Sequence, residues 1–90
     1  MTTTAIRPED IIADGADYTE INGIQVRKGT VGAFLANIDL LENSNSSIDE
    51  KKQALELLRE LAPAIIATRL HNHVSFKNNQ VAEIIQQAAQ

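Results

Sequence analysis

The sequence has 90 residues, 43% of them hydrophobic and 22% charged, with a formal net charge of −4 and no cysteine. A chain of this length and composition is expected to form one globular domain with a modest core, which must be built from Leu, Ile, Val and Ala because only three residues are aromatic. The lack of cysteine excludes disulfides, thiolate zinc sites and cysteine nucleophiles.

The start of the chain predicts a disordered tail over residues 1–5, followed by a single α+β domain over residues 6–90. The start has no apolar run after a basic segment, and no stretch of 18 apolar residues occurs, so we expect no secretory signal, no membrane span and a cytoplasmic protein. Pro8, followed by two acidic residues, predicts a helix of one or two turns that ends by Gly15.

Residues 17–28 carry the strongest local signal, two alternating runs on either side of Asn22-Gly23. This dipeptide is typical of the type I′ turn of a β-hairpin, and its two-residue loop fixes the strand register. The expected pairs are Ile21 with Ile24, Thr19 with Val26, Glu20 with Gln25 and Tyr18 with Arg27. Thr19, Ile21, Ile24 and Val26 then share one face, which we expect to be covered.

Three longer helices are predicted after the hairpin, over residues 31–43, 48–70 and 79–89. Thr30 is expected to cap the first, the Ser47 to Glu50 spacing predicts a capping box at the second, and Asn78 or Asn79 is expected to cap the third. Pro63 predicts either a kink in one helix or a division into two helices over 48–61 and 63–71, and the continuous apolar stripe favours the kink. Residues 71–79 are expected to be a connection with extended character from Val74 to Phe76.

The predicted fold is α+β, a hairpin packed against three to four helices. The residues expected in the core are Thr19, Ile21, Ile24, Val26, Val31, Phe34, Leu35, Ile38, Leu55, Leu58, Leu61, Ile65, Ile84 and Ile85.

The segment 23-GIQVRKGT-30 contains the residues of a phosphate-binding loop in the wrong order. In such a loop lysine follows the second glycine, whereas here Lys28 precedes Gly29 and the intervening residues alternate as in a strand. We interpret the segment as the junction between hairpin and helix. The alternative is a weak anion or phosphate site formed by Arg27, Lys28, Gly29 and Thr30 at the helix start.

His71 and His73 are two residues apart, which places them on one face of a strand. No third ligand follows from the spacing, so we predict no metal site and interpret them as loop or helix-capping residues. The pattern also nominates no catalytic residue and no cofactor, and enzymatic activity would need a pocket that joins Arg27, Lys28 and Thr30 to the histidine segment.

Tyr18, Glu20 and Arg27 share the polar face of the hairpin and form a candidate interaction patch, with hairpin stabilisation by the same pairs as the alternative. A two-stranded hairpin leaves both edges open and the second helix is rich in leucine, so we expect a homodimer. The basic residues are scattered, which disfavours nucleic-acid binding. The favoured function is a small interaction module that binds a protein or a small ligand.

Overall fold

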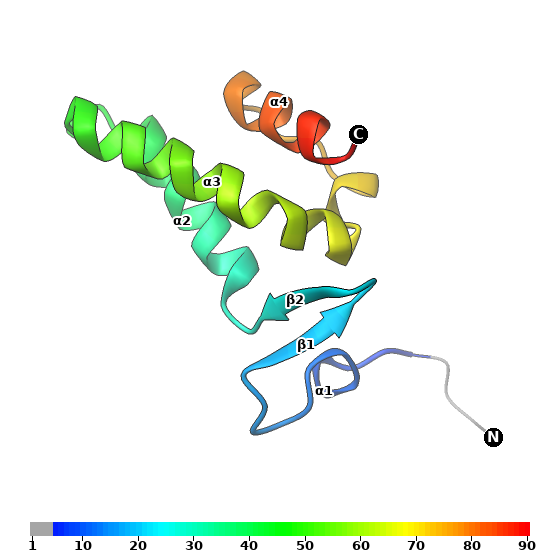
Figure 1. The fold of residues 1–90 in the computed structure, drawn as a ribbon. Coiled ribbons are helices and arrows are strands. Elements are labelled where there is room, and N and C mark those ends of the chain that lie inside the picture. Colours follow the sequence, from blue (N-terminus) through cyan, green and yellow to red (C-terminus); the bar gives the residue numbers. More distant parts are fainter. Residues whose placement is uncertain (1–4) are drawn as a thin grey trace.

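The computed structural model describes residues 5–90, so most of the predicted tail over 1–5 lies outside the described residues. The elements in chain order are α1 (Pro8–Ile11), β1 (Tyr18–Ile21), β2 (Ile24–Arg27), α2 (Thr30–Glu42), α3 (Ile48–Thr68), a 3₁₀ helix over Leu70–Asn72 and α4 (Asn79–Ala88). Figure 1 shows one hairpin accompanied by helices, which confirms the predicted α+β class.

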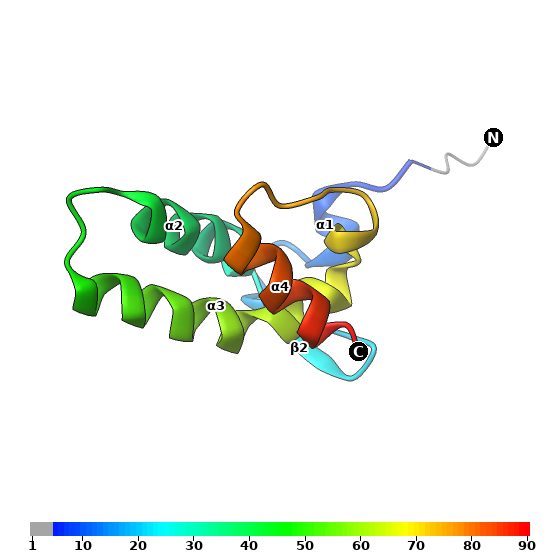
Figure 2. The same cartoon turned by 90° about the horizontal axis from the view of Figure 1, so that it is seen from above.

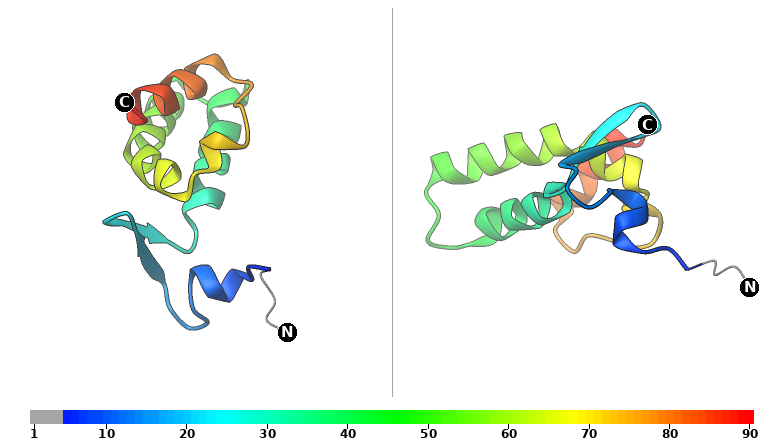
Figure 3. Two further views of the ribbon diagram at one scale, coloured as in Figure 1. Left: turned by 90° about the vertical axis from the view of Figure 1, so that its right-hand side faces the viewer. Right: turned by 90° about the horizontal axis from the view of Figure 1, so that it is seen from below.

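The three longer helices form a bundle to which the hairpin is attached at one end. Helices α2 and α3 run side by side, and α4 packs on α3 (Figure 2). Viewed along the bundle, α2, α3 and α4 outline a triangle, and the hairpin and α1 lie together outside it (Figure 3, left). The main contact between the hairpin and the bundle is that of β2 with α3.

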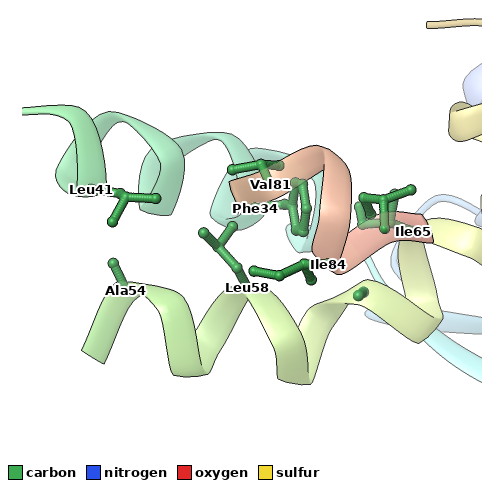
Figure 4. Packing of buried hydrophobic residues seen from close by; sticks show 9 residues of the cluster. Phe34, Leu41, Ala54, Leu58, Ile65, Val81 and Ile84 are labelled. Atoms are coloured by element: carbon green, nitrogen blue, oxygen red, sulfur yellow. The ribbon is translucent and has the colours of Figure 1, made fainter. Parts of the chain in front are cut away.

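The core lies inside the triangle of helices. Phe34 and Leu58 are fully buried, and the ring of Phe34 meets Phe76 edge-on with the ring centroids 5.6 Å apart. Figure 4 shows side chains of α2, α3 and α4 converging on this centre. The buried cluster consists of Phe34, Leu41, Ala54, Leu58, Ala62, Ile65, Val81, Ile84 and Ile85.

Three residues predicted in the core are exposed instead: Ile24 and Val31 at 38% each and Leu35 at 48%. On α2, Phe34, Ile38 and Leu41 point toward the bundle, whereas Val31 and Leu35 lie on another flank of the helix, which stays partly exposed. The hairpin rests against the end of α3, so Val26 is buried but Ile24, beside the turn, is not.

The hairpin has the predicted register, with Tyr18 opposite Arg27 and Ile21 opposite Ile24. Asn22 and Gly23 have positive φ values of 53° and 78°, as a type I′ turn requires.

Two of the three predicted helix caps are confirmed. The Ser47 hydroxyl accepts from the Glu50 N–H at 3.0 Å while the Glu50 carboxylate accepts from the Ser47 N–H at 2.9 Å, and Asn78 caps α4. The prediction for Thr30 was wrong, because the N-cap residue is Gly29 and the Thr30 hydroxyl accepts from the Arg27 N–H at 3.1 Å.

Helix α3 is continuous across Pro63, so the alternative of two helices was wrong. The helix ends earlier than predicted because Arg69 adopts a left-handed conformation with a φ of 66°. The 3₁₀ helix over Leu70–Asn72 then replaces the start of the predicted connection. Within residues 5–90, no helix is both long enough and apolar enough to cross a membrane.

Candidate functional site

A cavity of about 420 Å³ opens where α1, the hairpin, the start of α2 and the end of α3 meet. We call this cavity the hairpin groove. Most of its lining side chains are aliphatic, and its charged members are cationic. The lining residues are Ile11, Ile12, Ile21, Asn22, Val26, Arg27, Lys28, Val31, Ala67, Thr68 and Arg69.

Two of the cations, Arg27 and Lys28, are held in place by the end of β2. The Lys28 N–H donates to the Asp17 carbonyl at 2.8 Å and extends the ladder of the hairpin by one pair. The Arg27 N–H points the other way and donates to the hydroxyl of Thr30, which is 94% buried at the start of α2. Both backbone positions are therefore fixed, and the two side chains remain exposed.

The third cation, Arg69, is placed by the end of α3. The left-handed conformation of Arg69 turns the chain out of the helix. Thr68 supports this end, because its hydroxyl donates to the Ile65 carbonyl at 2.6 Å and accepts from the Leu70 N–H at 3.3 Å. Both partners of the Thr68 hydroxyl are thus within its own chain segment.

The groove is electrostatically one-sided. Arg27, Lys28 and Arg69 are its charged lining residues, and its lining contains no carboxylate and no imidazole. Within residues 5–90, none of these three side chains forms an ion pair. An apolar floor with unpaired cations at its rim can bind a molecule that has an apolar body and a negative charge.

The four residues of the predicted anion site have different environments. Arg27 and Lys28 line the hairpin groove, whereas Thr30 is buried and uses its hydroxyl on the Arg27 N–H. Gly29 is exposed at the N-cap of α2. The cation that sequence reasoning missed is Arg69, which lies more than forty positions after Lys28 and meets it only because α3 ends beside the hairpin.

The three residues of the predicted interaction patch are exposed. Tyr18 faces Arg27 across the hairpin, and Glu20 lies two positions further along β1 on the same face. Their exposure leaves this face open to a partner.

The histidines lie away from the groove. His71 belongs to the 3₁₀ helix and lines a separate cavity of about 270 Å³ together with Ser75 and Phe76, while His73 is exposed. The Nδ1 atom of His71 is buried without a hydrogen-bond partner among residues 5–90. The structure thus does not join the histidine segment to Arg27 and Lys28 in one cavity. Across the same residues, no group of three or more His, Cys, Asp or Glu side chains could hold a metal ion.

Comparisons with protein-family models, with curated proteins and with solved structures find no match.

Proposed function

We propose that the protein is a small cytoplasmic interaction module that works as a homodimer and binds its ligand or partner in the hairpin groove. The observation that carries the proposal is the groove itself, in which aliphatic side chains and three unpaired cations from the ends of β2 and α3 surround about 420 Å³ of space. Ligand sites in proteins are typically cavities of about 300 to 1,000 Å³ with an apolar lining and a few placed polar groups.

The chemistry of the lining favours binding over catalysis. Guanidinium and ammonium groups attract and orient an anion, whereas proton transfer near neutral pH needs a group that titrates there. The one hydroxyl in the lining, that of Thr68, has no histidine or carboxylate beside it among the lining residues to accept its proton. It hydrogen-bonds instead to the backbone of Ile65 and Leu70. A small enzyme built on this groove is therefore the weaker alternative.

Nucleic-acid binding is weaker still, because the basic residues of α3 do not gather on one surface. Lys51 and Lys52 lie near its start, and Arg69 follows its last residue, about 17 positions after Lys52 and roughly 25 Å away at 1.5 Å per residue. A phosphate backbone needs a continuous basic track.

The groove can be tested with N-phenyl-1-naphthylamine, an uncharged dye whose fluorescence rises in apolar sites. Val31 lines the groove and Leu35 lies one helical turn beyond it on the same flank of α2, so Val31→Gln and Leu35→Gln form a matched pair. We expect Val31→Gln to weaken dye binding about fivefold, the effect of losing about 1 kcal/mol of apolar contact, and Leu35→Gln to leave it unchanged. Absence of dye binding, or equal effects of the two changes, would refute the groove as the binding surface.

The proposed dimer interface is the outer edge of β1. The Lys28 N–H bonds to the Asp17 carbonyl, and hydrogen-bonded pairs alternate along an antiparallel ladder, so the next such pairs are Thr19–Val26 and Ile21–Ile24. The N–H groups of Tyr18 and Glu20 therefore point away from β2. An unpaired strand edge is a template for another strand. The edge of β1 contains neither proline nor lysine, two of the residues that block such pairing.

A second copy of β1 fits this edge in one antiparallel register better than in others. In this register Thr19 of one copy lies opposite Thr19 of the other on the two-fold axis, and Tyr18 of each copy faces Glu20 of the other. The outward N–H groups of Tyr18 and Glu20 then form the hydrogen bonds between the two copies. A shift by two residues toward the turn would place the Glu20 side chains opposite each other, which like-charge repulsion disfavours.

The dimer can be tested by sedimentation equilibrium with two proline variants. Glu20 and Gln25 form one cross-strand pair, and both N–H groups point outward, toward opposite edges of the hairpin. Glu20→Pro therefore removes a donor from the proposed interface without breaking the ladder, and Gln25→Pro does the same at the other edge. We expect a wild-type dimer that Glu20→Pro dissociates and Gln25→Pro preserves. A monomeric wild type, or a dimer that survives Glu20→Pro, would contradict this interface.

A further inference from the structure

We propose that the ligand of the hairpin groove is a single-chain carboxylate of about ten carbons, bound with its hydrocarbon chain on the aliphatic floor and its carboxylate among Arg27, Lys28 and Arg69. This inference rests on the proposed function, because it names the ligand of the same groove. Its basis is the combination of charge, floor chemistry and size within one cavity.

The charge of the groove is opposite to that of the whole chain. The formal net charge is −4, yet three of the eight Lys and Arg residues line this one cavity and no acid does. Arg27 and Lys28 come from the end of β2 and Arg69 from the end of α3, so the cations approach the cavity from separate elements. A guanidinium binds a carboxylate through two parallel hydrogen bonds, and a neighbouring ammonium adds a point charge.

The floor of the groove, formed by its aliphatic lining residues, favours a hydrocarbon chain over a nucleotide base or another aromatic ring. Val26 and Ala67 are almost completely buried beneath the groove, and Ile12 and Ile21 are half-buried in it. None of the lining residues is aromatic, so the groove lacks the stacking platform that nucleotide bases use. Aliphatic walls are instead suited to a flexible chain of methylene groups.

The same floor disfavours a peptide as the occupant. A bound peptide brings backbone N–H and C=O groups that cost free energy when they are buried without partners. The lining offers few uncharged partners, because Asn22 and Thr68 are its polar uncharged residues and the Thr68 hydroxyl already makes two hydrogen bonds. A fatty-acid-like chain has no polar group to bury except its carboxylate, which meets the cations.

The volume of the groove fits a chain of about ten carbons. At about 30 Å³ per water-sized group, a cavity of 420 Å³ holds about 14 such groups. The carbon and oxygen atoms of decanoate number about twelve, so decanoate fits with little space left. Much longer chains would extend beyond the groove into water.

The test measures displacement of the naphthylamine dye by decanoate and by 1-decanol, which has the same chain without the charge. We expect decanoate to bind about tenfold more tightly than decanol at low salt, with the preference shrinking as salt is added. Arg69→Gln should remove most of this preference, and Lys28→Gln part of it. Lys52→Gln, the same charge change near the start of α3, should leave it unchanged.

The possible failures separate this inference from the proposed function. If decanol binds as tightly as decanoate, or if Arg69→Gln and Lys52→Gln behave alike, the groove binds apolar molecules but the carboxylate assignment is wrong. If an acetylated Leu-Glu-Leu-Glu peptide displaces the dye more strongly than decanoate, the occupant is an acidic peptide and this inference is again wrong. If neither the dye nor decanoate binds, the proposed function fails as well. Circular dichroism of each variant checks that it is folded.

Discussion

The adjacent residues Leu57 and Leu58 provide the sharpest test of how the bundle is packed. Leu58 is completely buried among α2, α3 and α4, whereas 39% of Leu57 is exposed. Leu58→Ala leaves a cavity that the three helices cannot close, which costs about 3 to 4 kcal/mol of unfolding free energy. Leu57→Ala loses only about 1 kcal/mol, because its partial burial contributes a share of the transfer free energy and leaves no enclosed void.

The difference of about 2 to 3 kcal/mol between the variants is a substantial fraction of the total stability expected for a domain of this size, about 5 to 13 kcal/mol. It can be measured by urea unfolding followed by circular dichroism, where stability divided by the slope gives the midpoint. Both variants delete the same atoms from the same helix, so propensity effects cancel. Equal losses would show that α3 presents a different face to the bundle, and a concentration-dependent loss in Leu57→Ala would move the dimer interface to α3.

Two further predictions concern the capping box of α3. Ser47→Ala removes the acceptor of the Glu50 N–H and should lower the unfolding free energy by about 1 kcal/mol, measured by urea unfolding at pH 7. The second prediction concerns the Glu50 carboxyl. Hydrogen bonds from Ser47, chiefly from its backbone N–H and secondly from its hydroxyl, hold the pKa of this carboxyl below its ordinary value of 4.5. A lowered pKa in the folded state stabilises the protein above pH 4.5, and this contribution is lost as the pH falls through the folded value. Wild type should therefore be more stable than Glu50→Gln at pH 7 and equal to it near pH 2, and a difference that persists in acid would contradict the assignment.

The parts of the fold that were predictable from the sequence depend on residues close together in the chain. Asn22-Gly23 sets the turn because those two residues adopt positive φ values, and Ser47 caps α3 through a residue three positions away. Each signal is complete within a few residues, so it can be read without knowing where the remaining elements lie.

The parts that were not predictable depend on how elements dock. Val31 and Leu35 have the spacing of core residues, and only the position of α3 and α4 leaves their flank of α2 uncovered. Ala54 and Ala62 were not predicted in the core, yet both are buried because small side chains let neighbouring helices approach closely. The hairpin groove was the least predictable feature, because its lining comes from four parts of the chain: α1, the hairpin, α2 and α3.

Arg69 connects the fold to the proposed site. Its φ of 66° is the left-handed conformation that glycine adopts most easily at the end of a helix, and a side chain there costs about 1 kcal/mol. Residues held in such conformations are concentrated at functional sites, where the surrounding structure compensates for the strain. An arginine at this position gives the groove its third cation at the expense of stability.

Replacing Arg69 should therefore change stability and ligand binding in opposite directions, and both can be measured. Arg69→Gly should raise the unfolding free energy by about 1 kcal/mol, because the left-handed conformation no longer opposes a side chain. The same change should weaken decanoate binding about fivefold, because most of the charge preference is lost, and leave decanol binding unchanged, because the aliphatic lining of the groove is intact. A more stable variant with unaltered decanoate affinity would show that Arg69 ends the helix and does not bind the ligand. A less stable variant would mean that the arginine side chain makes contacts that outweigh its backbone strain.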